Sequence, residues 1–260
     1  MKTVLVTGAC VNTGVDIVRK FITEGWNVAF TGRSAARVAE AEKNYRALRD
    51  NVAVSGFVAS SLTEEGEVDE AGVEELFDRM EEAGYSVDAV VFNAADQGLG
   101  MTFFESPVKD FERVLTTNVV WNYCLARRAT QTMCEKGGGS LVFINSNTAY
   151  RAIPDRVAYI ASKGAQLGMM RALALDLGKY GIRVNAVLPG MIKTDRWEKN
   201  PDFYATVPSR WTPLGEVAVG ADVAEAAYLL PAHAPNTTGA ELSVDGGNMI
   251  QLYPLVPENK

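Results

Sequence analysis

Tyr159 and Lys163 stand four residues apart in a segment with a helical pattern. Side chains at this spacing share one face of a helix, with Cβ atoms about 5–6 Å apart. A phenol is a poor base at neutral pH, because its reference pKa is about 10, and a nearby ammonium lowers that pKa. Ser146 precedes Tyr159 by thirteen residues and follows a short apolar run, which predicts a strand end facing the same cleft. These three side chains could move a proton to or from an oxygen atom of a substrate.

A turn near the N-terminus suits a dinucleotide. It follows the first apolar run and opens a helical pattern, and its residues include Gly8, Asn12, Thr13 and Gly14. In such a turn the backbone can approach a pyrophosphate, and the helix N-terminus presents free N–H groups and a positive dipole end. The glycines alone fit an ordinary turn equally well, and their place on the first strand–helix connection favours the dinucleotide.

The second apolar run ends near Gly32 and Arg33. An acidic residue at this place binds the ribose hydroxyls of NAD, whereas an arginine accommodates the 2′-phosphate of NADP. Because an arginine stands here and no acid does, the sequence predicts a preference for NADP(H) over NAD(H). A surface arginine at the start of a helix is the alternative interpretation.

Short apolar runs alternate with longer segments of helical pattern along the whole chain. We predict strands at residues 3–7, 27–31, 52–58, 88–93, 140–145, 183–188 and 241–244, and helices at 14–24, 35–50, 72–83, 108–136, 158–180 and 220–230. Most of the runs lack charge and do not alternate apolar with polar residues, as in parallel strands covered on both faces. This rhythm predicts an α/β fold, a single Rossmann-type doubly wound parallel sheet flanked by helices on both faces, in one domain over residues 1–260.

Composition and charge exclude several classes of protein. Of the 260 residues, 47% are hydrophobic and 22% are charged, which is typical of a globular chain. The net charge of −7 disfavours nucleic acid and anionic membranes as partners. Three cysteines suggest neither a disulfide framework nor a metal site, and a single histidine, His233, makes a histidine-rich metal centre impossible. We therefore expect a cytoplasmic protein with no metal and no membrane segment.

With these features together, the chain resembles the short-chain dehydrogenase/reductase family over essentially its whole length. The landmarks fall in the order of that family, and they are the turn at Gly8 and Gly14, Asn93-Ala94-Ala95, Asn118, Ser146, Tyr159 with Lys163, Pro189-Gly190 with Thr194, and Val244-Asp245-Gly246-Gly247. The resemblance implies hydride transfer between a nicotinamide and a carbonyl or carbinol carbon of a small molecule.

The resemblance implies four catalytic residues. Tyr159 would be the general acid/base, and Ser146 would orient the substrate oxygen. Lys163 would lower the pKa of Tyr159, bind the nicotinamide ribose and pass protons outward. Asn118, inside a long helix, would hold a water molecule in that relay.

The resemblance also implies which residues bind the cofactor. They are Gly8, Asn12, Thr13, Gly14, Arg33, Asn93, Ala94, Tyr159, Lys163, Pro189, Gly190, Ile192 and Thr194. The chain departs from the family pattern at three places on the cofactor side. Asn12 and Ala95 stand where the family has glycine, and Ser60 or Ser61 replaces an aspartate beside the adenine.

Two other functions remain open on the sequence. A halohydrin dehalogenase resembles this family and needs no cofactor, but its characteristic Ser-Tyr-Arg set has arginine where this chain has Lys163. A non-catalytic dinucleotide-binding protein is the other alternative, and Asn12 in the glycine turn favours it.

Residues 191–213 resemble the mobile substrate loop of the family. The candidate substrate contacts are Asp96, Gln97, Tyr150, Met191, Trp197 and Tyr204. Aromatic side chains here could stack on a sugar or another ring, or could simply cover the cleft.

Residues 108–136 and 158–180 resemble helices that pair between subunits in this family. The tail at residues 251–260 has apolar side chains and no evident core of its own. We expect a homotetramer, or at least a dimer, with the tail against a neighbouring subunit. Burial of one face within a monomer is the alternative.

Overall fold

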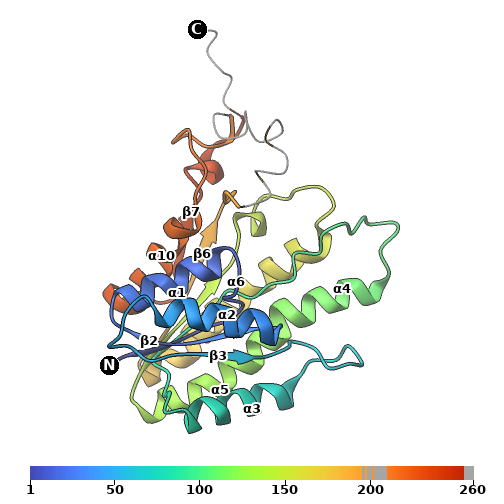
Figure 1. The fold of residues 1–260 in the computed structure, drawn as a ribbon. Helices are drawn as coiled ribbons and strands as arrows, with labels where there is room; N and C mark the ends of the chain where they lie inside the picture. The colour runs from blue at the N-terminus through green and yellow to red at the C-terminus, as the bar shows by residue number, and fades with distance from the viewer. Residues whose placement is uncertain (195–196, 198–200, 202–209, 255–260) are drawn as a thin grey trace.

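A seven-stranded parallel sheet forms the centre of the molecule (Figure 1). The computed structural model describes residues 1–194, 197, 201 and 210–254. The strands are β1 (Thr3–Val6), β2 (Asn27–Gly32), β3 (Val54–Val58), β4 (Ala89–Phe92), β5 (Gly139–Ile144), β6 (Ile182–Pro189) and β7 (Glu241–Val244). Their order is β3-β2-β1-β4-β5-β6-β7, and every pair is parallel.

Successive side chains of the strands enter two different cores. In β1, Val4 and Val6 face one core and Leu5 faces the other, and all three are fully buried. This is the period of two that a strand imposes on its side chains. Both faces of the sheet are therefore covered, which explains why the strands read as unbroken apolar runs.

Helices cover each face of the sheet. The first core contains side chains of α1 (Thr13–Thr23), α2 (Ala35–Arg46) and α10 (Gly220–His233). The second contains side chains of α3 (Glu70–Glu82), α5 (Trp121–Glu135) and α6 (Val157–Leu177), and α4 (Val108–Leu115) packs on α6. The predicted doubly wound Rossmann-type fold is confirmed.

The expected helix at residues 108–136 is divided in the structure. A π-helical segment, η1 (Thr116–Val120), separates α4 from α5, and the N–H of Trp121 donates to the carbonyl of Thr116. π-Helical turns are rare and occur frequently at functional sites. Asn118 lies in this segment and is fully buried.

The expected helix at residues 220–230 continues for three more residues, through Pro231, to His233. Arg183, on β6, donates to the carbonyl oxygens of Leu230, Pro231 and Ala234. This guanidinium satisfies carbonyls that the end of a helix leaves without intrahelical partners.

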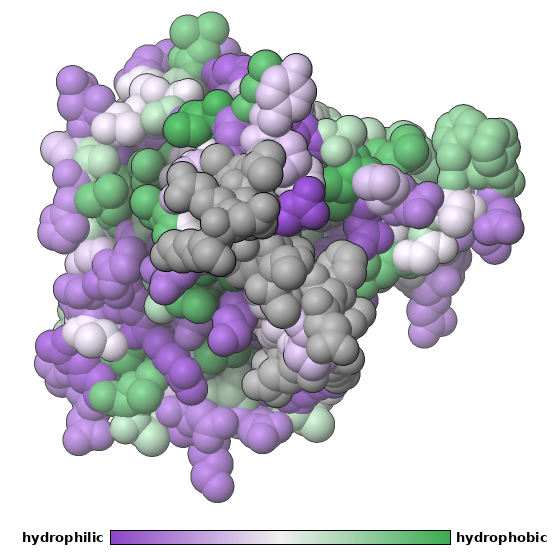
Figure 2. All heavy atoms as spheres, turned by 90° about the horizontal axis from the view of Figure 1, so that it is seen from above, coloured by the Kyte–Doolittle hydropathy of each residue, from purple (hydrophilic) through white to green (hydrophobic). Residues whose placement is uncertain are grey.

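The face seen in Figure 2 is largely hydrophilic, and hydrophobic side chains gather at the tip of a lobe on the right. On that side Figure 1 places the segment between β4 and α4. Exposed apolar residues of this segment are Leu99, Phe103 and Phe104. Among the described residues, none of the helices combines the length and apolar character required to cross a bilayer.

Candidate active site

The turn between β1 and α1 needs both of its glycines. Gly8 has φ +65°, and a Cβ there would lie 2.8 Å from the Cα of Ala94. A Cβ on Gly14 would lie 2.5 Å from the carbonyl oxygen of Gly8. Asn12 has φ 50° and ψ −141°, a conformation that favours glycine and strains other residues, and its side chain makes no capping hydrogen bond. The free N–H groups that begin α1 therefore stay available to an anion.

A cavity of about 970 Å³ opens beside this turn. Its walls come from the segments that follow β1, β2, β3 and β4, at the carboxyl ends of the strands. The sheet order reverses between β1 and β4, and ligands of open α/β sheets bind at such a switch point. The volume is at the upper end of ordinary ligand pockets, which suits an extended molecule such as a dinucleotide.

Seven of the thirteen residues expected to bind the cofactor line this cavity. They are Gly8, Asn12, Thr13, Gly14, Arg33, Asn93 and Ala94, together with the replacing residues Ser60, Ser61 and Ala95 and the expected substrate contacts Asp96 and Gln97. Ser146, Tyr159, Lys163, Pro189, Gly190, Ile192 and Thr194 are not part of its lining. The structure thus separates the expected cofactor residues into one group that lines the cavity and a second group outside its lining.

Asn93 fastens the end of β4 to the glycine turn. Its side-chain amide donates to the carbonyl oxygens of Thr7 (3.1 Å) and Gly8 (3.0 Å). The hydroxyl of Thr7 in turn accepts from the backbone N–H groups of Asn93 and Ala94. Asn93 therefore shapes the cavity by holding two of its walls together.

Two arginines stand where the cavity meets the second strand. Arg33 follows β2, and Arg37 lies in the first turn of α2, whose N-cap is Ser34. Both side chains are exposed and both line the cavity. Arg33 is predicted from the sequence and Arg37 is not, although its four-residue spacing from Arg33 at a helix start could have indicated it. A third arginine of the lining, Arg113, is paired with Asp96 and Asp110.

Ser146 and Tyr159 form the candidate proton-transfer pair. The Ser146 hydroxyl oxygen accepts from the backbone N–H of Thr148 (3.2 Å) and from the Thr148 hydroxyl (2.9 Å). The Ser146 O–H is therefore not donated to Thr148 and can be donated to another group. Ser146 is also a hydrogen-bonding partner of Tyr159. Burial raises the pKa of Tyr159, and this effect outweighs the lowering by Ser146 and by the charge of Arg156.

Lys163 is buried without a carboxylate partner among the described residues. Its ammonium donates to the carbonyl oxygen of Ile144 (2.8 Å) and to the Gln166 side-chain oxygen (3.1 Å). It lies 5.5 Å from the centre of the Tyr159 ring. Desolvation lowers the pKa of Lys163 to about 7. The expected lowering of the Tyr159 pKa by Lys163 is not what this structure shows, because burial dominates both groups.

Gln166, which was not predicted from the sequence, connects Lys163 to the π-helical segment. Its side-chain nitrogen donates to the carbonyl oxygen of Asn118 (2.7 Å), while its oxygen accepts from Lys163 and from Asn145 (3.1 Å). The Asn118 carbonyl also accepts from the Asn122 side chain (2.9 Å). The backbone carbonyl of Asn118 thus accepts hydrogen bonds from two side-chain amides, although Asn118 was expected to hold a water molecule of the proton relay.

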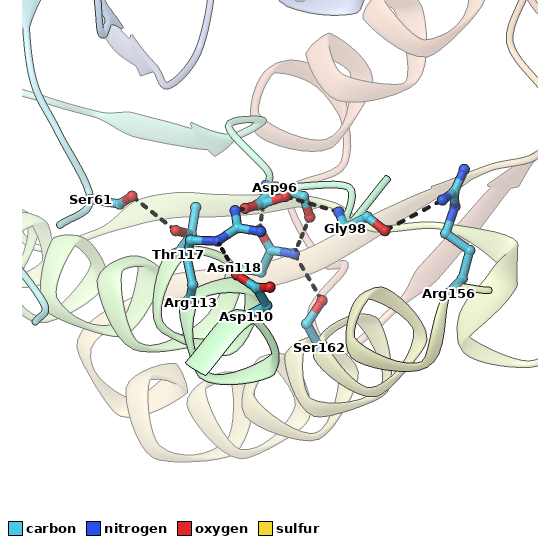
Figure 3. A network of polar contacts seen from close by, with 9 residues as sticks. All are labelled: Ser61, Asp96, Gly98, Asp110, Arg113, Thr117, Asn118, Arg156 and Ser162. Atoms are coloured by element: carbon cyan, nitrogen blue, oxygen red, sulfur yellow. Dashed lines mark hydrogen bonds and ion pairs between the residues drawn. The ribbon is translucent and has the colours of Figure 1, made fainter. Parts of the chain in front are cut away.

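Asn118 also joins the cavity to α6, as Figure 3 shows. Its side chain accepts from the backbone N–H of Asp96 (2.7 Å) and donates to the Asp96 carbonyl (2.8 Å) and to the Ser162 hydroxyl (2.9 Å). Ser61, on the cavity wall, hydrogen-bonds to Thr117 (3.0 Å). The π-helical segment therefore fixes the wall of the cavity relative to the helix that carries Tyr159.

The segment after β6 packs against the closing residues of the chain. The Gly190 N–H donates to the carbonyl of Val244 (3.0 Å), and a Cβ on Gly190 would lie 2.7 Å from that of Asp245. Ile192 forms a bridge with Ala218, and the Thr194 carbonyl accepts from the backbone of Trp197. Position 190 is a glycine because the two chain segments approach each other too closely for a Cβ.

The expected substrate contacts are dispersed. Tyr150 is 55% exposed, and its hydroxyl donates to Glu241 (2.6 Å), which takes that hydroxyl away from the cavity. The indole N–H of Trp197 donates to the Ile192 carbonyl (3.2 Å), and Met191 is half-buried. Tyr204 lies outside the described residues.

Comparisons with known proteins agree with this architecture. A family model described as enoyl-(acyl carrier protein) reductase matches residues 8–248. L-fucose dehydrogenase of Mus musculus is 32% identical over 252 residues, covering 95% of this chain and 88% of that protein. An NADP-dependent (R)-specific alcohol dehydrogenase of Lentilactobacillus kefiri is 32% identical over 255 residues, covering 96% and 97%. The solved structure of ElxO with NADP bound is similar at a TM-score of 0.83 and 26% identity, covering 96% of this chain and 99% of that one.

Proposed function

The chain belongs to the short-chain dehydrogenase/reductase family, and from this premise we propose that it transfers a hydride between NADP(H) and a carbonyl or secondary alcohol of a small molecule. It is an oxidoreductase of the kind that acts on alcohols or carbonyls. The observation that carries the finer proposal is that Tyr159 hydrogen-bonds to Ser146 and that the Lys163 ammonium lies 5.5 Å from the centre of the Tyr159 ring.

The residues of the cluster take different parts in the reaction. In the reducing direction Tyr159 gives its phenolic proton to the substrate oxygen, and in the oxidising direction it accepts the hydroxyl proton. Ser146 has its oxygen held by Thr148, so its O–H is free to donate to the substrate oxygen and to orient it. When bound, the nicotinamide supplies or receives the hydride at the substrate carbon.

Lys163 is the group that exchanges a proton with Tyr159. An ammonium whose pKa is about 7 loses and gains a proton near neutral pH, whereas an ordinary lysine does not. Gln166 and the Ile144 carbonyl accept hydrogen bonds from the charged form and hold it in place. The number of protons held at the active site near neutral pH therefore depends on the protonation of Tyr159 and Lys163 together.

The residues of the cavity fit a phosphorylated dinucleotide. Gly8 and Gly14 leave space that a Cβ would fill, and the start of α1 supplies free N–H groups. Arg33 and Arg37 together would hold the 2′-phosphate of NADP, since guanidinium groups make strong charge-assisted hydrogen bonds to phosphate. The names of the alcohol dehydrogenase and of the ElxO complex include NADP, which supports the same preference.

The experiment combines cofactor titration with a turnover assay. NADPH and NADH are titrated by fluorescence into the wild type, Arg33→Ala and Arg37→Ala, and a panel of ketones and alcohols is assayed by the absorbance of the reduced nicotinamide. We expect NADPH to bind more tightly than NADH, and each variant to weaken NADPH by about 10-fold or more while changing NADH little.

Each other result selects a different function. Equal affinities for NADPH and NADH in the wild type contradict the NADP preference. A wild type that binds NADPH without oxidising or reducing anything in the panel favours a binding protein. A protein that binds neither cofactor favours the cofactor-independent dehalogenase type.

We also propose a cytoplasmic homotetramer or dimer of single-domain subunits. The support comes from the outer face of α6, where exposed small residues are Ala161, Gly164, Ala165, Gly168 and Ala172. Leu175 continues this face and is 83% exposed. Arg171 also lies on this face and pairs with Glu241, so the small residues and Leu175 form an apolar stripe on a partly polar surface. Exposed apolar stripes of this kind are frequently covered by a partner.

A further inference from the structure

Arg156 stands at the start of α6, beside the candidate proton-transfer pair. The N–H of Ile160 donates to the Arg156 carbonyl (2.9 Å), so the helical hydrogen-bond pattern begins at Arg156. Arg156 is the N-cap residue of α6 and has φ −139°, and Tyr159 follows it by three residues, within the first turn. Arg156 therefore stands at the end of α6 that carries the candidate catalytic tyrosine.

The guanidinium of Arg156 has no carboxylate partner among the described residues. Its contacts are two long hydrogen bonds from Nη1 (3.4 Å each), to the carbonyls of Gly98 and Asp155. Arginine carries five N–H donors, so most of its hydrogen-bonding capacity remains. Arg113, Arg128 and Arg171 are each paired with at least one carboxylate. Arg151 and Arg183 are also half-buried without a carboxylate partner among the described residues, but Arg183 makes three hydrogen bonds to carbonyls and Arg151 lies against Asn248, whereas Arg156 is the one of the three whose charge acts on Tyr159.

The contact with Gly98 places Arg156 at the edge of the cavity. Figure 3 shows the segment from Asp96 to Gly98 held by Asn118 on one side and approached by Arg156 on the other. Gln97, inside this segment, lines the cavity. The positive charge of Arg156 also acts on the phenol of Tyr159. It lowers the pKa of that phenol, whereas burial raises it.

We propose that the substrate carries an acidic group, a carboxylate or a similar oxyanion, a few bonds from its carbonyl carbon, and that Arg156 binds this group. The inference deepens the proposed function, because it names the class of substrate at the same site. A planar guanidinium matches the two oxygens of a carboxylate. Arg156 thereby orients an oxo acid so that its carbonyl oxygen meets Tyr159 and Ser146.

The test compares oxo acids with their uncharged esters. Probes are 2-oxo, 3-oxo and 4-oxo acids, each paired with its methyl ester, and 3-oxobutane-1-sulfonate as the sulfonate counterpart of the 4-oxo acid. Binding to the complex of the enzyme with NADPH is followed by the fluorescence of the cofactor, and turnover is measured separately. The variants are Arg156→Met and Arg156→Lys, and the matched control is Arg151→Met, which removes a half-buried arginine that donates to Asn248.

We expect the wild type to bind at least one acid about 10-fold or more tightly than its ester, and Arg156→Met to remove that difference while the ester changes little. Arg156→Lys keeps part of the preference, and Arg151→Met keeps all of it. A stronger loss for the carboxylate than for the sulfonate in Arg156→Met identifies an oxo acid, and the reverse order identifies a sulfonate.

Three results overturn the inference. They are the absence of any acid preference in the wild type, an equal loss for acids and esters in Arg156→Met, and an equal loss of acid binding in Arg151→Met. The proposed function is judged on a different signal. Acids that bind through Arg156 but are not reduced contradict hydride transfer and leave the inference standing, whereas esters reduced as well as acids support hydride transfer and remove the inference.

Discussion

At the scale of single residues, the unusual feature is a buried ammonium balanced only by neutral groups. Lys163 is 2% exposed, and its hydrogen-bond acceptors are a backbone carbonyl and the Gln166 amide. Removing an ammonium from water costs free energy that neutral acceptors only partly return. This cost is the physical origin of its lowered pKa, and it makes Lys163 a group that titrates near neutral pH.

Lys163→Met should therefore change stability in a pH-dependent way. The folded pKa is about 7 and the reference value is 10.5, so between these values the unfolded wild type binds more protons than the folded one. The stability of the wild type then rises with pH in this window, by up to about 1.4 kcal/mol per pH unit. The advantage of the Met variant should be largest at and below about pH 7 and shrink towards about pH 10.

Urea unfolding at several pH values measures this difference. Lys43→Met on the exposed side of α2 is the control, and its stability relative to the wild type should not vary with pH in the same window. A Lys163→Met difference that stays constant from neutral to alkaline pH would show that the buried lysine has an ordinary pKa.

Sequence spacing predicts Ser146, Tyr159 and Lys163 as candidate site residues, because two of them share a helix face and the third follows a strand. It does not identify Gln166, whose partners lie on β5 and on the π-helical segment, far away in sequence. Nor does it identify Arg156, because only the fold brings the carbonyl of Gly98 to its guanidinium. Residues whose role depends on contacts between distant segments carry no local signature.

At the scale of elements, the strands were predictable and the π-helical segment was not. Every predicted strand is present with ends shifted by at most a few residues, because unbroken apolar runs between turns leave few alternatives. A π-helical turn has no comparable pattern, since the apolar positions around residues 116–120 continue the helical rhythm of α4 and α5. The expected helix end at Leu230 was wrong because Arg183 supports the carbonyls around Pro231 from a neighbouring strand.

The close approach of Gly14 to Gly8 in the turn between β1 and α1 predicts that a substitution at Gly14 displaces helix α1. Gly14→Ala places a Cβ 2.5 Å from the Gly8 carbonyl, so α1 must move away from the turn. We expect a loss of stability of about 1–3 kcal/mol and clearly weaker binding of NADPH. Gly178→Ala is the matched control, because Gly178 has φ −55° and ψ −38° and its added Cβ would meet open space.

The control variant should be as stable as the wild type or more stable, by up to about 1 kcal/mol. Urea unfolding and fluorescence titration of NADPH provide both readouts. Wild-type stability and affinity in Gly14→Ala would mean that the close approach of Gly14 to Gly8 does not position α1.

At the scale of the whole molecule, the surface is acidic overall but has apolar parts. The outer face of α6 contains small residues, Leu175 and Arg171, and these are exposed in the described part of the chain. Such a face can approach another helix closely. The fold class and the order of the elements followed from the alternation of strands and helices, whereas the arrangement of subunits has no equally direct signal in the sequence.

Leu175→Glu tests whether this face joins subunits. A charge in the centre of an apolar contact is costly when unpaired, so the variant should have a smaller mass in solution than the wild type. Light scattering measures the mass of both proteins, and circular dichroism checks that the variant is folded. A wild-type mass equal to one chain would remove the proposal of a homotetramer or dimer.

The central claim is that Tyr159 moves the proton during hydride transfer, and Tyr159→Phe tests it most directly. The substitution removes one oxygen atom and hardly changes shape. Steady-state turnover with an active ketone should fall by at least about 100-fold, the low end of general acid–base effects, while NADPH affinity stays close to that of the wild type. Tyr180→Phe, an exposed tyrosine beyond the end of α6, should change neither quantity. A Tyr159→Phe enzyme that keeps more than about a tenth of wild-type turnover would contradict the account.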